Sequence, residues 1–368
     1  MHYIDLGIGK QFIKYWFDTK NMPYSLTNAE IDYIDNTLKQ ITITVPSKLI
    51  RNSRSIRDRN YWKAKEFQNW ILYYSTLVLF MIPRMKCYAI HWSYLVRAYY
   101  ILLQNNISRN SIREAHRLLT IFVALTEFYY SRGAMTFNVH QLLHTAQCVI
   151  NWGPLFYHSG YGFENGNGNI VKLVQAAKGV QYQIVRIIGM NRSDRILTKF
   201  MLRNNPDSEV LEYVRYLETR ECGKVWTTNI GRYFGIFSRL APRWKRELNL
   251  SDAAIVYRKL IKMECVYLSC NTVRLRSNNS FAKIIDGNFV QIVFFIVDRL
   301  HQREYTVYKV VDVEDIFDNN LAEFQIKRIT AINEELRAVH TNNIDKICVY
   351  INCNDERYLC ATPNMYFY

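Results

Sequence analysis

Apolar residues recur along the first two thirds of the chain at the three- and four-residue spacing of helices. Short helices are expected over 7–45, around a turn at Asn21-Met22-Pro23. The almost continuously apolar segment 61–81 predicts a buried helix that stops at Pro83, and 84–104 predicts a second. Ser111 and Glu114 have the spacing of a capping box, which would open a helix that ends near Gly133. Helical patterning continues to about residue 262.

The pattern changes after Met263. Two apolar runs flank Asp286-Gly287, which is a strong β-hairpin signal. Residues 304–311 and 346–351 read as further strands. The expected fold class is therefore mainly α with a smaller β-rich C-terminal domain. The expected boundaries are 1–45, 46–262 for a helical region and 263–368 for the β-rich domain.

Composition adds a basic charge to this picture. Lys and Arg number 47 and Asp and Glu 32, a net charge of +15 that points to a polyanionic partner such as nucleic acid. The longest apolar run is too short to cross a bilayer, and the start shows no signal peptide. The eight irregularly spaced cysteines do not suggest a secreted disulfide framework. We therefore expect an intracellular protein that has no membrane partner.

The cations are densest between residues 46 and 65. This segment has a net charge of +6, because Asp58 is its one acid, and Tyr61 and Trp62 lie among the cations. Such a segment can neutralise phosphates and stack on bases, or it can be an ordinary solvated face. The candidate DNA-binding residues are Lys48, Arg51, Arg54, Arg57, Arg59, Lys63 and Lys65.

Two other stretches could carry chemistry. His140 and His144 are four residues apart, so on a helix both imidazoles could face one zinc ion, or they could be ordinary helical histidines. Four glycines lie within 160–168 and precede a segment with helical spacing. Glu164 within this stretch is either an acid held at a helix start or a solvated loop carboxylate. Arg243-Trp244-Lys245-Arg246 is a weaker basic cluster, and the Cys-x4-Cys pairs read as strand cysteines rather than metal ligands.

Several blocks together resemble the C-terminal half of CACTA-type (En/Spm-like) DDE transposases. The resemblance covers residues 1 to about 190, with weaker similarity in the tail. The matching blocks are Met1-His2-Tyr3-Ile4-Asp5-Leu6-Gly7-Ile8-Gly9-Lys10, Tyr61-Trp62-Lys63-Ala64-Lys65-Glu66-Phe67, Met135-Thr136-Phe137-Asn138-Val139-His140-Gln141-Leu142-Leu143-His144, and Asn151-Trp152-Gly153-Pro154-Leu155-Phe156 running into Gly162-Phe163-Glu164-Asn165.

The resemblance implies an RNase H-like catalytic core with a helical insertion, of which the chain would hold the insertion and a C-terminal remnant. Intact relatives use three acids and two Mg²⁺ ions to cut DNA. By motif, Glu164 matches the third acid, and His140 and His144 match an H-x3-H that binds zinc together with a C-x2-C pair. No C-x2-C occurs here, and the matching position of the second acid precedes Met1.

The resemblance therefore implies a nuclear, transposase-derived DNA-binding protein that is inactive alone in DNA cleavage and strand transfer. A repurposed, non-enzymatic chromatin-binding protein is the alternative, and a homo-oligomer stays open.

Overall fold

The structure is a computed structural model that describes residues 2–49, 54–204, 225–236, 240–272, 277–317, 324–353 and 355–364. The described chain divides into two compact units. The first comprises residues up to His158 together with those from Val225 onward, and the second covers 159–204 of the described residues.

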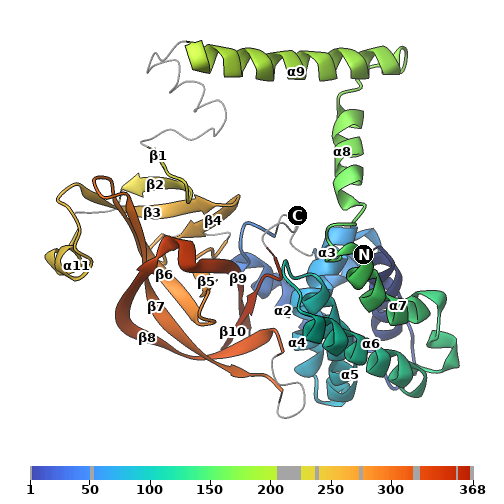
Figure 1. Ribbon diagram of the computed structural model, residues 1–368. Helices are drawn as coiled ribbons and strands as arrows, with labels where there is room; N and C mark the ends of the chain where they lie inside the picture. The colour runs from blue at the N-terminus through green and yellow to red at the C-terminus, as the bar shows by residue number, and fades with distance from the viewer. Residues whose placement is uncertain are drawn as a thin grey trace. The chain divides into compact units, whose positions relative to one another are not determined.

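The first half of the larger unit is helical (Figure 1). Its elements are η1 (Tyr3–Ile8), α1 (Gly9–Phe17), α2 (Asn28–Thr44), η2 (Ile56–Tyr61), α3 (Ala64–Asn69), η3 (Trp70–Tyr74), α4 (Ser75–Phe80), η4 (Pro83–Met85), α5 (Lys86–Leu102), α6 (Arg109–Tyr130), η5 (Arg132–Ala134) and α7 (Phe137–Trp152).

The expected helices around Pro83 are confirmed, with one difference. The segment 64–80 is helical and ends before Pro83, but a wider π turn, η3, interrupts it. The expected start of helix α6 at Ser111 is wrong, because α6 begins at Arg109. The Ser108 hydroxyl, not that of Ser111, caps α6, by accepting a 3.1 Å hydrogen bond from the N–H of Ser111. Glu114 instead pairs with Arg117.

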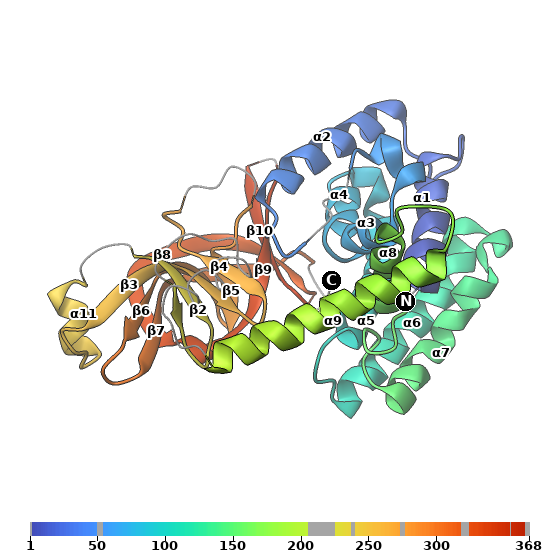
Figure 2. The same cartoon turned by 90° about the horizontal axis from the view of Figure 1, so that it is seen from above.

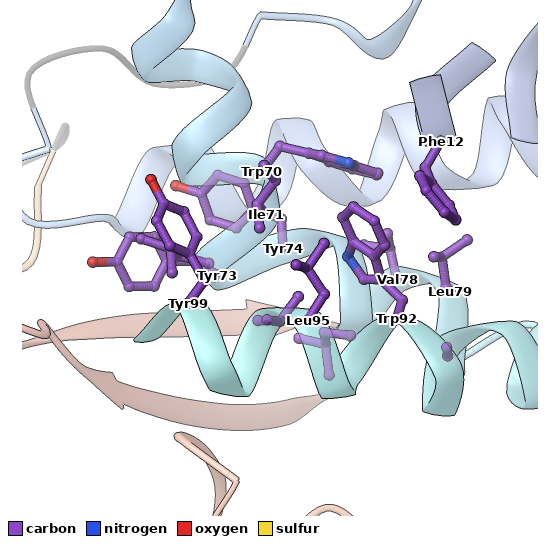
Figure 3. Close-up of a cluster of buried hydrophobic side chains, with 14 of the residues drawn as sticks. Phe12, Trp70, Ile71, Tyr73, Tyr74, Val78, Leu79, Trp92, Leu95 and Tyr99 are labelled. Carbon is purple, nitrogen blue, oxygen red and sulfur yellow. The ribbon is translucent and has the colours of Figure 1, made fainter. Parts of the chain in front are cut away.

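Large aromatic side chains fill the core of the helical half. Figure 3 shows Phe12, Trp70, Tyr74, Trp92 and their neighbours packed between helices. The rings of Phe12 and Trp92 have centroids 5.1 Å apart, and those of Trp16 and Trp92 meet edge to face at 5.0 Å. The indole N–H of Trp92 donates to Ser75 Oγ at 2.7 Å, whereas the buried indole N–H of Trp70 has no hydrogen-bond partner among the described residues.

The second half of the larger unit is an antiparallel sheet. Its strands are β1 (Trp226–Thr227), β2 (Arg232–Ile236), β3 (Ala254–Lys262), β4 (Cys265–Leu268), β5 (Phe281–Ile284), β6 (Phe289–Asp298), β7 (Arg303–Asp315), β8 (Ile326–His340), β9 (Ile344–Cys353) and β10 (Glu356–Ala361), and helix α11 (Pro242–Glu247) lies between β2 and β3 in sequence.

Six of these strands close on themselves. The pairing order β6-β5-β9-β10-β8-β7 returns to β6 through a further β6–β7 pairing, while β3 extends the sheet from the far end of β6. The predicted hairpin of β5 and β6 is confirmed: Gly287 has φ +95° in its turn and donates from its N–H to Ile284 O at 2.9 Å.

Strands β9 and β10 join the sheet to the helices, because both of their faces are buried. Val349, Ile351 and Cys360 belong to the same core cluster as the helices. Cys348 and Leu359, on the opposite face, pack among the other strands. The Tyr100 hydroxyl of α5 donates a 3.0 Å hydrogen bond to Ala361 O, which ties the two halves together.

The expected fold class, mainly α with a small β-rich C-terminal domain, is wrong. The structure is about 48% helix and 25% strand, and the described residues form a sheet of ten strands. The helical prediction to residue 262 fails at β1, β2 and β3, although α11, between β2 and β3, is helical. Every regular element within 2–45 is a helix, and the RNase H-like remnant expected over 1–45 stays a prediction.

The pairing of β3 explains why it is a strand and not the expected helix. In β3, Val256, Tyr257 and Leu260 have spacings that suit either a helix or a strand. Their backbone pairs with β2 on one side and β6 on the other, and only the strand form allows this. A Cβ at Gly231 would lie 2.3 Å from Ile261 O, so the approach of the chain to β3 requires glycine there.

The smaller unit consists of α8 (Tyr161–Lys172) and α9 (Val180–Asn204), which Figures 1 and 2 draw as two separate rods. None of the side chains described in 159–204 is buried. The expected glycine-rich loop is part of a helix, since α8 begins at Tyr161 and includes Gly166 and Gly168. No described helix in either unit combines the length and apolar character needed to cross a bilayer.

Candidate nucleic-acid interface

The basic segment around η2 is held by acids from distant parts of the sequence. Arg54 forms a two-pronged ion pair with Glu66, with Nε to Oε1 at 2.9 Å and Nη2 to Oε2 at 3.0 Å. Burial raises the pKa of Glu66, but hydrogen bonds from Arg54 and from the Lys63 N–H outweigh it and hold that pKa below its usual value. Because Glu66 is buried, Arg54 has a structural task.

The other two described arginines of the segment differ in how firmly they are held. Arg59 pairs with Asp18 and lies 5.6 Å from the centre of the Phe17 ring, with most of its side chain covered. Arg57 pairs with Asp32, but 54% and 58% of the two side chains stay exposed. An exposed pair is worth about 0–1 kcal/mol, so a phosphate can compete for Arg57.

Two of the lysines are held within the structure, and a third is exposed and could bind an anion. Lys48 is buried beside Cys265, and burial lowers its pKa. The ammonium of Lys65 donates a 2.8 Å hydrogen bond to the buried Gln68, near Asp5, and burial lowers its pKa to about 7. Lys63 is exposed, and within the described residues its ammonium has no acidic partner. Arg51 lies outside the described residues.

The basic segment therefore has a structural part and a part that is open to a ligand. The structural part attaches the segment to the helices and to β4 through Arg54, Arg59, Lys48 and Lys65. The cations best placed to bind an anion are Arg57 and Lys63. Sequence reasoning could not separate these groups, because the paired acids Asp18 and Asp32 precede the segment on other elements.

His140 and His144 lie on one exposed face of α7, as expected from their spacing. Their Nε2 atoms are 3.4 Å apart. Two nitrogens bound to one tetrahedral zinc ion at 2.0–2.1 Å would be about 3.3 Å apart, so the pair could chelate a metal. Zinc takes four ligands, however, and no group of three His, Cys, Asp or Glu side chains gathers anywhere in the described chain. A zinc site at His140 and His144 stays a prediction, since the described residues supply two of the four ligands that zinc needs.

Glu164 lies in the first turn of α8 and is exposed, which confirms its expected place at a helix start. It belongs to the smaller unit, whereas His140 and His144 belong to the larger one. Because two-metal DNA cleavage uses several carboxylates around a pair of ions, Glu164 by itself does not make a Mg²⁺ site.

The secondary candidates have ordinary structural roles. In α11, Trp244 is buried, Arg243 pairs with Glu247, and Lys245 pairs with Asp252. Cys265, Cys348 and Cys353 are buried strand residues, as the sequence suggested, whereas the partly buried Cys270 lies just after β4.

A second concentration of cations lies in the smaller unit. Residues 159–204 contain seven Lys and Arg against Glu164 and Asp194, a net charge of +5. Lys172, Lys178, Arg186 and Arg192 are exposed, and so are Phe163 and Tyr182. The charge of this stretch can be read from the sequence, but the exposure of these side chains cannot.

Comparisons of this chain with models of protein families, with curated proteins and with solved structures find no match.

Proposed function

We propose that this chain is a DNA-binding protein of transposase descent that acts in the nucleus. The observation that carries the binding proposal is the exposure of cations that are weakly held or lack an acidic partner. Arg57 and Lys63 provide them in the larger unit, and Lys172, Lys178, Arg186 and Arg192 in the smaller unit. The descent rests on the blocks that resemble CACTA-type transposases.

DNA is favoured over a neutral partner because the charge imbalance is large. Net charge is +15 over the chain and +5 within 159–204. Each phosphate that a Lys or Arg neutralises releases condensed counterions, so binding gains free energy that does not depend on base sequence. Exposed aromatic side chains beside the cations, such as Tyr61 and Tyr182, add surfaces on which bases could stack.

The test is a fluorescence anisotropy titration of a labelled duplex of mixed sequence at increasing KCl concentrations. We expect log K to fall linearly with log salt, with a slope of about −0.9 for each phosphate contact. A matched measurement with an uncharged morpholino duplex of the same sequence should show no binding. Absence of binding to the DNA duplex at low salt would overturn the proposal.

A further inference from the structure

The solvent face of α7 has an unusual composition. The helix has 16 residues and contains no Lys, Arg, Asp or Glu. Its inner face packs Val139, Leu142 and Val149 into the core. Helices at the edge of a protein usually carry charged residues on their outer side, so this outer side calls for an explanation.

The outer face is a narrow stripe of hydrogen-bonding groups. His140, His144, Gln147 and Asn151 follow one another at i, i+4, i+7 and i+11, within about 60° of arc around the helix. Gln147 donates to Asn151 at 2.9 Å, and the two imidazoles are 3.4 Å apart. All four side chains can both donate and accept hydrogen bonds, and at present they mostly contact one another or solvent.

The arrangement is the reverse of a protein-docking face. Protein interfaces have an apolar centre and a polar rim. Here polar groups form the stripe, while the exposed apolar groups are separate: Phe137 and Trp152 lie at the two ends with 73% exposure each, and Ile150 lies beside the stripe with 59% exposure. A second protein chain would have to bury four polar side chains at the middle of the contact, which is costly unless each is matched.

The size and charge of the surroundings fit a DNA groove. From His140 to Asn151 the stripe runs about 16 Å, which matches the rise of about five base pairs. A helix about 10–12 Å across enters the major groove, about 12 Å wide, where amide side chains can bond adenine in pairs. Arg132 is exposed just before α7. A second exposed cation, Lys14, is also near the start of α7: it lies one turn after Gln11 in α1, and the Gln11 side chain donates a 2.8 Å hydrogen bond to Ala134 O. These cations lie toward the helix start, whose dipole also favours phosphate.

We propose that α7 reads base edges in the major groove of duplex DNA through His140, His144, Gln147 and Asn151. This inference rests on the proposed DNA-binding function and adds sequence preference to it. The cations provide affinity that any sequence can satisfy, and the stripe selects a site of about five base pairs.

The test begins with selection from a random duplex library by the full chain, in EDTA so that zinc cannot occupy the histidines. We expect an enriched site. The double variant Gln147→Ala, Asn151→Ala should reduce the preference for that site over a shuffled duplex by at least about fivefold, with an unchanged salt dependence. Replacing the purines of the site by 7-deazapurines, which lack the major-groove N7 acceptor, should also lower the affinity of the wild-type protein for the site.

The matched control is Asn110→Ala with Asn333→Ala, two exposed amides on α6 and β8, which should keep the full preference. Circular dichroism melting checks that each variant folds. Failure of selection to enrich any site, an unchanged preference in the α7 variant, or no effect of 7-deazapurines would overturn the inference. So would a wild-type dimer that the α7 variant dissociates, because the face would then be a protein interface. These results leave the proposed function standing, whereas absence of binding to any duplex at low salt removes both.

Discussion

The Tyr99 hydroxyl donates a 2.9 Å hydrogen bond to Oδ1 of Asp5, although the two residues are 94 positions apart and both are buried. Gln68 approaches the other carboxylate oxygen, with its Nε2 3.4 Å from Oδ2. Asp5 lies in a block that resembles part of a transposase catalytic region, but its surroundings are those of a core carboxylate. It orders η1, α3 and α5 around one buried polar centre.

Replacing Tyr99 by Phe should destabilise the protein by about 1–3 kcal/mol, because the buried Asp5 carboxylate loses a donor. Urea unfolding followed by tryptophan fluorescence measures this. Tyr94→Phe, at a partly exposed position of the same helix, is the control and should leave the midpoint unchanged. Equal midpoints for the two variants would show that the hydrogen bond adds nothing to stability.

Lys65 should make stability rise with pH in an alkaline window. Burial lowers its pKa to about 7 in the folded protein, while an unfolded lysine titrates near 10.4. Between these values the unfolded chain binds more protons, so the free energy of unfolding increases from about pH 7 to pH 10. Comparing urea midpoints across this range, Lys65→Met should remove much of that rise. A Lys65→Met variant with the same pH slope as wild type would contradict the assignment.

His91 should make the free energy of unfolding fall as the pH is lowered into the acid range. It is buried against Phe122, with Nε2 2.9 Å from Phe122 O, and burial lowers its pKa to about 4. Unfolded histidine titrates near 6.5, so stability is lost as pH falls from about 6.5 to 4, by on the order of 3 kcal/mol. In His91→Phe this part of the acid destabilisation should disappear. The control His116→Phe, at an exposed site on α6, should keep it.

Replacing Arg54 should lower the stability of the protein much more than replacing Arg57. Arg54→Ala leaves the buried Glu66 carboxylate without its main partner and should lower the thermal midpoint clearly. Arg57→Ala breaks only an exposed pair and should change it little. Differential scanning calorimetry of both variants decides the point, and equal midpoints would mean that Glu66 does not depend on Arg54.

Arg57 and Lys63 should instead affect DNA binding. The double variant Arg57→Ala, Lys63→Ala should weaken duplex binding and flatten the log–log salt slope by about 0.9 for each lost phosphate contact. Arg337→Ala is a closely matched control, since Arg337 and Glu335 are 54% and 59% exposed, almost as in the Arg57–Asp32 pair. If both variants have the wild-type slope, the basic segment is a solvated, structural face.

Much of the local structure could be predicted from the sequence, because short-range physics decides it. Pro83 ends a helical run, since it lacks an N–H and restricts the residue before it. Asp286-Gly287 specifies a hairpin, since glycine takes the positive φ of the turn at no steric cost. The spacing of His140 and His144 places them on one helix face, since 3.6 residues make a turn.

The remaining features depended on partners far away in the sequence. Residues 254–262 form a strand because β2 and β6 flank them, and their own pattern also suits a helix. Arg54 and Lys63 look alike in a basic segment, yet only Arg54 meets a buried carboxylate. The local sequence contains the charge and the propensity of each residue. Which charge is neutralised, and which face stays open to solvent, is decided only when the chain brings distant elements together, because burial and pairing belong to the folded arrangement.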